Sequence, residues 1–235
     1  IKYASNSFLA VKISFINEIA RLAEAVGADV SDVARSMGLD KRIGSKFLHA
    51  GLGFGGSCLP KDTNAITHIA REAGTDMSIV RAAIDVNAGL PGRALAKAEA
   101  LTDGLAGKTV ALLGLAFKPN TDDIRSAPAR EILARLLELG CTVRGHDPAA
   151  MENFTQFHPE LVPCESPYEA CVGADLAILV TEWNQYRQLD FVELGRTMAA
   201  KAFLDCRNVY DRPHLDKFGF RYDCFGRADH TYRGE

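Results

Sequence analysis

Beyond Gly107, short apolar runs alternate with stretches of helical periodicity, and this alternation constrains the fold more than any other feature of the chain. We expect buried strands at 108–114, 142–146, 176–180 and 202–205, an edge strand at 220–224, and a helix over 128–139. Successive strand–helix–strand units build a parallel sheet with helices on both faces. Residues 107–235 are therefore predicted to form a doubly wound, Rossmann-like α/β domain.

Residues 1–106 have a different character and are predicted to form an all-helical domain. Helical periodicity covers 1–26, 29–37, 60–74 and 77–102, and a kink or break is expected in the last helix, where Gly89, Pro91 and Gly92 fall close together. The first helix is apolar nearly all round, which indicates burial on several sides, within the domain or against a second subunit. The fold class is thus α/β, with a helical domain preceding the sheet domain.

The overall composition excludes several classes of protein. The 235 residues carry a formal net charge of −3 and no dominant basic stretch, so we expect neither a nucleic-acid partner nor a membrane partner. No apolar run approaches the ~20 residues that a membrane-spanning helix needs. The six cysteines form no CxxC pair and no Cys/His cluster, which argues against a metal site and a disulfide framework. Reduced thiols in a cytoplasmic protein are the expectation.

The sharpest motif is the run GLGFGGSCLPKD at residues 51–62. Closely spaced glycines let a backbone adopt positive φ and approach a ligand. Pro60 suits the first turn of the following helix, which puts Cys58 at the helix entrance beside Lys61, where positive charge favours thiolate over thiol. Asp62 adds a carboxylate within reach of whatever Cys58 attacks. The motif indicates a nucleophilic cysteine; the alternative is a buried, inert cysteine beside a flexible loop.

Two further features carry polar groups of interest. The loop after the first expected strand, GLAFKPNTDDIR at 114–125, is not GxGxxG, because Ala116 and Asn120 stand where glycines would be expected. It favours a single nucleotide contacted by Lys118 over a dinucleotide pyrophosphate; an ordinary connecting loop is the alternative. Lys2 and Asn6 lie four residues apart on one helix face, where they could share one oxygen as acceptor or simply form a solvated strip.

Together these residues resemble a known family. The segments KYASN (2–6), FINE (15–18), RIG (42–44), GFGGSCLPKD (53–62), GLAFKPNTDD (114–123), TEW (181–183) and DCRN (205–208) look like those of UDP-glucose 6-dehydrogenases, within the UDP-glucose/GDP-mannose dehydrogenase family. The likeness spans the whole chain in order and spacing. GDP-mannose dehydrogenases share the cysteine loop, but the segments around Asn6, Arg42 and Trp183 look more like the UDP-glucose branch.

The resemblance implies a domain organisation and a reaction. Family members combine an N-terminal Rossmann domain for NAD, a central helical dimerisation region and a C-terminal UDP-binding domain. Residues 1–106 and 107–235 correspond to the last two. Because the chain opens within a helix without an initiator Met or a capping residue, we expect the NAD-binding domain to be absent and the isolated chain to lack turnover. The expected function is a homodimeric, cytoplasmic enzyme of polysaccharide biosynthesis that oxidises UDP-glucose to UDP-glucuronate in two NAD-dependent hydride transfers.

The resemblance also assigns site residues. Cys58 matches the nucleophile that carries a thiohemiacetal and then a thioester, with Lys2, Asn6 and Asp62 as catalytic partners. Lys61 and Arg125, with Cys58, match positions that touch NAD. The substrate-binding positions are Arg42, Phe47, His49, Gly51, Gly53, Phe54, Gly55, Phe117, Lys118 and Arg207. Arg42 is expected to reach the neighbouring subunit's site. Family members often have glycine where Cys206 stands, which bears on the contact made by Arg207.

Three other functions remain open. The first is a related nucleotide-sugar dehydrogenase acting on GDP-mannose or a UDP-N-acetylhexosamine, with the same chemistry in a different pocket. The second is a non-catalytic, nucleotide-binding dimerisation module. The third, a thiol redox protein built on Cys58, is the weakest because no resolving cysteine lies nearby in the sequence.

Overall fold

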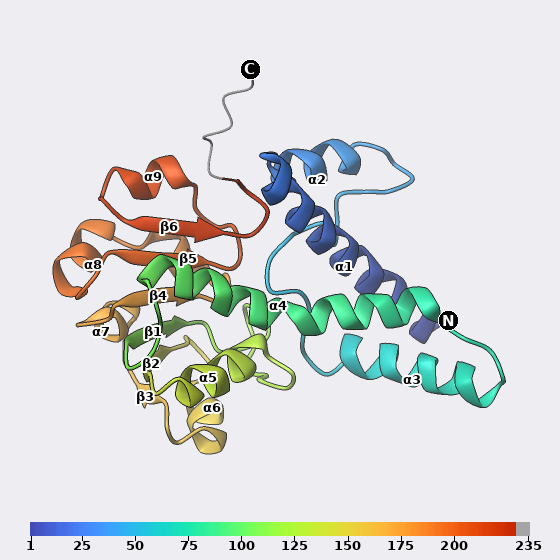
Figure 1. Ribbon diagram of the computed structural model, residues 1–235. Helices are drawn as coiled ribbons and strands as arrows, with labels where there is room; N and C mark the ends of the chain where they lie inside the picture. Colours follow the sequence, from blue (N-terminus) through green and yellow to red (C-terminus); the bar gives the residue numbers. More distant parts are fainter. Residues whose placement is uncertain (229–235) are drawn as a thin grey trace. The chain divides into compact units, whose positions relative to one another are not determined.

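The computed structural model describes residues 1–228, and these form two compact units (Figure 1). The first, here called the helical unit, comprises residues 1–90 together with residues 224–228. The second, here called the α/β unit, comprises residues 91–223.

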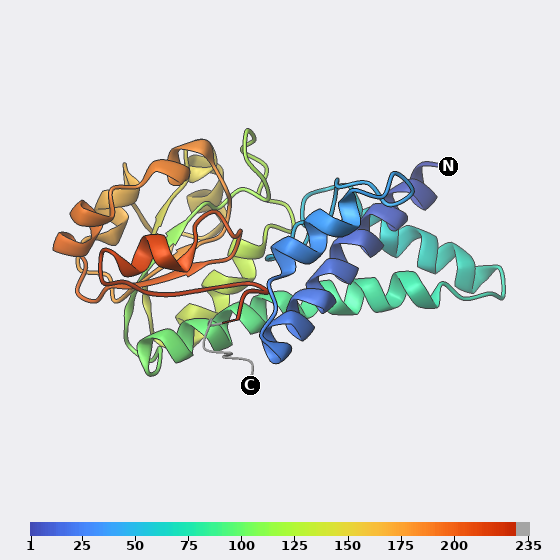
Figure 2. The same cartoon turned by 90° about the horizontal axis from the view of Figure 1, so that it is seen from above.

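Three helices and part of a fourth build the helical unit. They are α1 (Lys2–Val26), α2 (Val30–Gly38), α3 (Leu59–Glu72) and the first half of α4 (Ser78–Thr102). α1 packs against α2 and α3, and α3 lies beside the first half of α4 (Figures 1 and 2). Gly27 ends α1 in the left-handed conformation, and the Asp29 carboxylate accepts a hydrogen bond from the amide of Ser31 to begin α2.

The core of the helical unit also receives the last described residues. Its buried cluster comprises Ile16, Ala20, Ala23, Val30, Leu48 and Ala50. The amide of Val30 donates to the carbonyl of Gly226 over 2.8 Å, and the amide of Gly226 donates to the Glu24 carboxylate over 2.7 Å. A side chain at Gly226 would overlap Ala20 and Val30, so glycine allows this close approach.

α4 runs unbroken from Ser78 to Thr102 with Pro91 inside it. Of the kink or break expected at this point, the break is therefore wrong, and the kink stays a prediction. Proline removes one helical hydrogen bond, but burial of the neighbouring apolar residues offsets that loss. Leu90 and Ala94, which flank the proline, are 4% and 0% exposed. The division between the two units falls at Leu90 and Pro91.

A single six-stranded sheet forms the centre of the α/β unit. Its strands are β1 (Thr109–Leu113), β2 (Thr142–His146), β3 (Val162–Pro163), β4 (Leu176–Leu179), β5 (Ala202–Asp205) and β6 (Arg221–Cys224), in the spatial order β3-β2-β1-β4-β5-β6. β1 to β5 pair in parallel, with Leu113 opposite His146 on one side and Leu179 on the other. Residues of β1, β4 and β5 are almost all fully buried, as expected for strands covered on both faces.

Short helices connect these strands. They are α5 (Pro128–Glu138), α6 (Met151–Phe157), α7 (Pro167–Cys171), the 3₁₀ helix η1 (Asn184–Gln188), α8 (Phe191–Thr197) and α9 (Arg212–Asp216). The strand order reverses between β1 and β4, which creates the switch point where open α/β sheets bind ligands, outside the carboxyl ends of the strands. The predicted α/β class, with helices preceding a doubly wound parallel sheet, is confirmed, and β6 is the expected edge strand.

The opposite edge strand, β3, was not predicted from the sequence because it has only two residues and one of them is proline.

Over residues 1–228, no helix is both long and apolar enough to cross a membrane.

Candidate active site

The start of α3 presents a cysteine thiol to solvent. Cys58 is the N-terminal capping residue of α3, and proline follows within the first helical turn. Cys58 is exposed, whereas the other five cysteines of the chain are buried. The hydroxyl of Ser57 lies close to the thiol, with 3.8 Å between Oγ and Sγ. The alternative of a buried, inert cysteine does not describe this residue, and the thiol is open to a reactant.

One turn further along α3, the carboxylate of Asp62 gathers polar groups from two helices. Asp62 is 0% exposed. The Asn6 amide nitrogen donates to Oδ2 over 2.6 Å, and Lys2 Nζ lies 3.7 Å from the same oxygen. Lys61 Nζ donates to Oδ1 over 2.7 Å. Lys2 and Asn6 of α1 therefore meet α3 at a shared oxygen, which is the arrangement that their four-residue spacing allows.

The electrostatics of this cluster follow from its contacts. The hydrogen bond from Lys61 lowers the pKa of the Asp62 carboxyl most, and Asn6 and Lys2 lower it further, against the opposing effect of burial. In return, the hydrogen bond to Asp62 raises the pKa of Lys61. Asp62 is therefore an ionised carboxylate surrounded by donors, which suits it for orienting Lys2 and Asn6 better than for taking up a proton.

The glycine-rich segment before Cys58 is held by two asparagines. Asn17 Oδ1 accepts from the amide of Gly51 over 2.9 Å, and Asn17 is 1% exposed. Asn87 Oδ1 accepts from the amide of Phe54 over 2.8 Å, and Asn87 Nδ2 donates back to the Phe54 carbonyl over 3.0 Å. The amides of Gly51 and Phe54 are thus already committed to protein partners, which leaves a ligand to be met by other groups of the segment.

Glycine is required within this segment. Gly53 has φ +72°, and a Cβ there would lie 2.0 Å from Asn87 Oδ1.

The sequence did not predict the roles of Asn17 and Asn87. Asn17 carried a signal, because it is a polar residue on a helix that is apolar on almost every side, and such a residue needs an internal partner. Asn87 carried none, since nothing local distinguishes it from a solvated position.

The other predicted substrate contacts of the helical unit lie on the segment after α2. Arg42 is exposed and forms an ion pair with Asp40, with 2.6 Å between Arg42 Nη2 and Asp40 Oδ2. Phe47 is 37% exposed and has φ +66°, while His49 is exposed. The ion pair between Arg42 and Asp40 is exposed and contributes little stability, so it does not fix the side chain of Arg42 in place. The roles of Arg42, Phe47 and His49 as substrate contacts remain predictions.

In the α/β unit, the predicted residues follow β1 and β5 at the carboxyl edge of the sheet. Phe117 and Lys118 lie on the loop after β1, with Lys118 Nζ 5.3 Å from the centre of the Phe117 ring. Arg207 follows β5; its Nε donates to the carbonyl of Val180 over 2.6 Å and lies 3.2 Å from Glu182 Oε2. The fold thus brings Lys118 and Arg207 to the same, carboxyl edge of the sheet. Lys118 follows β1, which borders the switch point, and Arg207 reaches the carbonyl of Val180 after β4.

Arg125 lies on the same long loop as Lys118 and pairs with Asp123, with 2.8 Å between Arg125 Nη2 and Asp123 Oδ2. Hydrogen bonding from Arg125 lowers the pKa of Asp123.

Cys206, next to Arg207, is 0% exposed, and burial raises the pKa of its thiol. Cys206 therefore belongs to the buried interior, and the role of Arg207 as a substrate contact stays a prediction.

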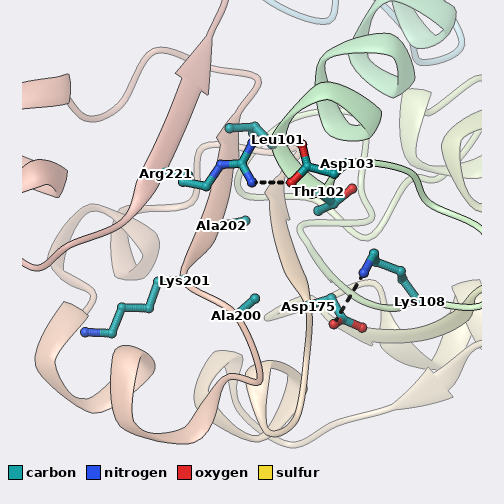
Figure 3. Close-up of a pocket in the computed structure, with 9 residues that line it drawn as sticks. All are labelled: Leu101, Thr102, Asp103, Lys108, Asp175, Ala200, Lys201, Ala202 and Arg221. Carbon is teal, nitrogen blue, oxygen red and sulfur yellow. Dashed lines mark hydrogen bonds and ion pairs between the residues drawn. The ribbon is translucent and has the colours of Figure 1, made fainter.

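A pocket of about 180 Å³ lies at the opposite, amino-terminal edge of the sheet (Figure 3). Its charged groups largely satisfy one another: Arg221 pairs with Asp103, and Lys108 lies 3.9 Å from Asp175 (Figure 3). Lys201 donates to the carbonyl of Phe218. We do not place the active site there, because ligands of open parallel sheets bind beyond the carboxyl ends of the strands.

No group of three or more His, Cys, Asp or Glu side chains in the described part of the chain could hold a metal ion.

Comparison with known proteins agrees with this division into a helical part and a sheet part. The model of the central domain of the UDP-glucose/GDP-mannose dehydrogenase family matches residues 1–89. The model of the UDP-binding domain of the same family matches residues 111–212. The chain therefore belongs to the UDP-glucose/GDP-mannose dehydrogenase family.

Curated relatives named UDP-glucose 6-dehydrogenase are similar over nearly the whole chain. The protein of Rhizobium meliloti (strain 1021) is 48% identical over 97% of this chain and 53% of its own length. The protein of Pseudomonas aeruginosa PAO1 is 46% identical over 96% of this chain and 51% of its own length. The chain thus spans about half the length of the curated relatives it matches.

Solved structures of the family superpose well on the fold. A UDP-glucose dehydrogenase from Pyrobaculum islandicum, 43% identical, has a TM-score of 0.82 over 88% of this chain and 47% of its own. An NDP-N-acetyl-D-galactosaminuronic acid dehydrogenase from Methanosarcina mazei Go1, 26% identical, has a TM-score of 0.88 over 100% of this chain and 51% of its own.

Proposed function

We propose that the protein oxidises UDP-glucose to UDP-glucuronate with NAD as cofactor and Cys58 as nucleophile. The observation that carries this proposal is the exposed thiol of Cys58 at the start of α3, one turn before a buried carboxylate that binds Lys2 and Asn6. The names of relatives 42–48% identical to the chain support UDP-glucose as the substrate. Residues 1–106 would act as the catalytic and dimerisation domain and residues 107–235 as the UDP-binding domain.

Cys58 makes the second oxidation possible. The first oxidation converts the C6 alcohol of UDP-glucose to an aldehyde. This aldehyde can be oxidised to an acid only after a nucleophile has added to its carbonyl carbon. The Cys58 thiolate forms that bond while the carbonyl oxygen takes a proton, which gives a thiohemiacetal. Loss of a hydride from carbon and a proton from oxygen converts this adduct to a thioester. Water then adds to the thioester carbon, the sulfur leaves, and the acid and the free thiolate are formed.

Lys2 and Asn6 would stabilise the oxyanions of these steps. Both already direct a donor group at Asp62, which fixes their side chains close to the helix that carries Cys58. A preorganised donor of this kind typically lowers an oxyanion's transition state by about 3 kcal/mol. Asp62 would orient these donors. Lys2 is also the candidate for activating the water molecule that attacks the thioester.

NAD supplies the hydride acceptor for both oxidations. The α/β unit does not fit the pyrophosphate of this cofactor, because the amides of Leu115 and Ala116 after β1 already donate to the Asp147 carboxylate. Lys61 and Arg125 are proposed as the cofactor contacts within residues 1–228. We therefore expect negligible NAD reduction by the 235 residues alone. Sustained NADH formation from UDP-glucose by this chain would refute that part of the proposal.

A homodimer through the helical unit is also proposed. Phe8, Phe15 and Leu22 of α1 are 64%, 44% and 58% exposed and lie seven residues apart. A seven-residue spacing places side chains along one seam of a helix, and an exposed apolar seam favours contact with a second apolar surface. A second copy of the chain offers the same seam and therefore a self-complementary contact.

The test of the nucleophile uses the aldehyde of UDP-glucose and does not need turnover. Iodoacetamide should label Cys58 in the free protein, and the aldehyde should slow this labelling far more than UDP-glucose does at equal occupancy. The reason is that only the aldehyde forms a bond to sulfur. Cys58→Ser removes the labelled site, and Cys164→Ala serves as a buried-cysteine control with unchanged kinetics. Equal protection by the alcohol and the aldehyde would contradict covalent trapping.

One observation favours keeping a second substrate class. The Methanosarcina mazei enzyme, whose name refers to an N-acetylated sugar, has a higher TM-score than the Pyrobaculum islandicum enzyme, although its identity is lower. Calorimetric titration with UDP, GDP, UDP-glucose and UDP-N-acetylglucosamine separates the candidates. We expect UDP and UDP-glucose to bind and GDP to bind weakly or not at all. Tighter binding of GDP or of the N-acetylated sugar nucleotide would move the assignment to another branch of the family.

A further inference from the structure

At the end of β2, the carboxylate of Asp147 is buried and accepts hydrogen bonds from four backbone amides. Oδ2 accepts from Leu115 over 2.7 Å and from Ala116 over 3.0 Å, and both of these residues belong to the loop after β1. Oδ1 accepts from Ala149 over 2.9 Å and from Ala150 over 2.8 Å, where the chain turns into α6. Asp147 is 3% exposed, so the protein supplies the whole environment of this carboxylate.

A fifth donor comes from the chain's single tryptophan. Nε1 of Trp183, after β4, donates to Asp147 Oδ2 over 3.1 Å, and Trp183 is 9% exposed. All five groups that reach the carboxylate are N–H donors. Converging backbone amides of this kind form the nests that bind phosphate and other anions in proteins. Asp147 therefore ties together the loops that follow β1, β2 and β4, all at the carboxyl edge of the sheet.

In dinucleotide-binding sheets of this type, the amides of the loop after the first strand contact the pyrophosphate together with the start of the next helix. Here the loop after β1 is built differently. The next helix, α5, begins only at Pro128, and the amides of Leu115 and Ala116 are already hydrogen bonded. The Thr181 hydroxyl donates to the Ala116 carbonyl over 2.6 Å, which fixes the loop on its other side.

We propose that Asp147 is a built-in anion that occupies the phosphate-binding position of the loop after β1 and thereby positions Lys118 for the diphosphate of the nucleotide sugar. The second half of this inference rests on the proposed function. A buried negative charge at the loop amides satisfies their dipoles and repels another anion. The diphosphate of a ligand must then be met by side-chain cations further along the loop. Lys118, two residues beyond Ala116 and exposed, is the first of these.

The test compares Asp147→Ala with Asp175→Ala. Asp175 is a suitable control because it also accepts a backbone amide hydrogen bond, from Thr109, but lies at the opposite edge of the sheet. Three quantities are measured for each variant: the thermal midpoint, the fluorescence of Trp183, and the dissociation constant for UDP by calorimetry. Each is recorded with sodium chloride and with sodium formate at equal ionic strength, because formate has the size and charge of the deleted carboxylate.

For Asp147→Ala we expect a changed Trp183 emission and a UDP dissociation constant raised roughly ten- to hundredfold, as the loss of charged hydrogen bonds predicts. Formate should restore both in a concentration-dependent manner. The wild type and Asp175→Ala should not respond to formate. Absence of formate rescue in Asp147→Ala, or unaltered UDP affinity together with an altered emission, would overturn the inference.

If Asp147→Ala does not fold in chloride, Asp147→Asn provides the second variant, since it keeps the size and one acceptor oxygen but loses the charge. We expect it to fold and to bind UDP more weakly than the wild type; wild-type affinity would show that the charge is not needed. If the wild type itself fails to bind UDP, the proposed function and the positioning of Lys118 both fail. Formate-dependent recovery of Trp183 emission would still support Asp147 as an internal anion.

Discussion

The side-chain amide of Asn87 forms a two-way pair of hydrogen bonds with the backbone of Phe54, accepting from its N–H over 2.8 Å and donating to its carbonyl over 3.0 Å. This pair joins α4 to the glycine-rich segment that precedes Cys58. The segment has few side chains of its own to pack, so its conformation depends on such contacts. The first prediction concerns this pair.

Replacing Asn87 with alanine should lower the free energy of unfolding by about 1–3 kcal/mol, because two backbone groups of a partly buried segment lose their partners. Urea denaturation measures this. Asn64→Ala is the matched control: Asn64 makes one exposed hydrogen bond to the Pro60 carbonyl, and its loss should cost less than about 0.5 kcal/mol. Equal effects of the two substitutions would show that the glycine-rich segment does not depend on Asn87.

A brief exposure of the native protein to iodoacetamide should add one label, at Cys58. The five other cysteines are buried, and burial raises the pKa of Cys171 to about 12 and also raises the pKa of Cys141, Cys164 and Cys206. Protonated, inaccessible thiols react slowly. Peptide mass spectrometry identifies the labelled residue, and Cys58→Ser should remain unlabelled. Early labelling of any second cysteine would contradict the burial described here.

The Asp62 cluster should make the helical unit sensitive to acid. The pKa of Asp62 is lowered in the folded protein, chiefly by Lys61, so the unfolded chain binds the proton more readily. Its stabilising contribution is therefore complete above the unfolded pKa, and it is lost as the pH falls below about 4 towards the folded pKa.

The difference in unfolding free energy between the wild type and Asp62→Asn should accordingly be largest near neutral pH and shrink below about pH 4. Chemical denaturation across this range measures it. Asp85→Asn, which removes an exposed carboxylate on α4, should follow the wild-type profile. A difference that stays constant down to about pH 2 would mean that the charge of Asp62 does not contribute.

Gly114, directly after β1, should tolerate no side chain. It has φ +92°, and a Cβ there would lie 2.5 Å from Thr181 Cβ and 2.7 Å from the Thr181 amide nitrogen. Gly140, in the same unit, has φ +74° with nothing within 4 Å of its Cβ position, so it isolates the cost of the backbone conformation.

We expect Gly140→Ala to destabilise by about 1–2 kcal/mol and Gly114→Ala by about 1–3 kcal/mol more, because the second substitution adds steric overlap to the same strain. Urea denaturation of the two variants compares them directly. If both cost the same, the close approach of β1's loop to Thr181 is not a constraint on the fold.

The exposed seam of α1 should control the oligomeric state. Phe15→Glu places a charge in the middle of this seam and should shift the protein from dimer to monomer. The reason is that burying an unpaired carboxylate in the interface raises the free energy of the dimer by more than the apolar contact lowers it. Analytical ultracentrifugation measures the mass in solution. Ile79→Glu, at an exposed apolar position of α4 outside the seam, should leave the mass unchanged. A monomeric wild type would rule out the proposed dimer.

The sequence by itself determined the order and type of most elements. The almost fully buried strands β1, β4 and β5 and the long first helix follow from local composition, since a strand covered on both faces must be apolar throughout and a helix repeats every 3.6 residues. It also indicated the position of Cys58 at the entrance of α3, because Pro60 after a run of glycines is a local signal.

Tertiary structure alone decided which distant groups meet. Asn6 and Asp62 are 56 residues apart, and Leu115 and Asp147 are 32 apart, yet each pair is joined by a short hydrogen bond. Residue order gives no information about such contacts, because they arise when the packing of α1 on α3, or of β1 beside β2, brings the two groups together. A buried polar atom then selects whichever partner lies within reach, and only the assembled fold defines that partner.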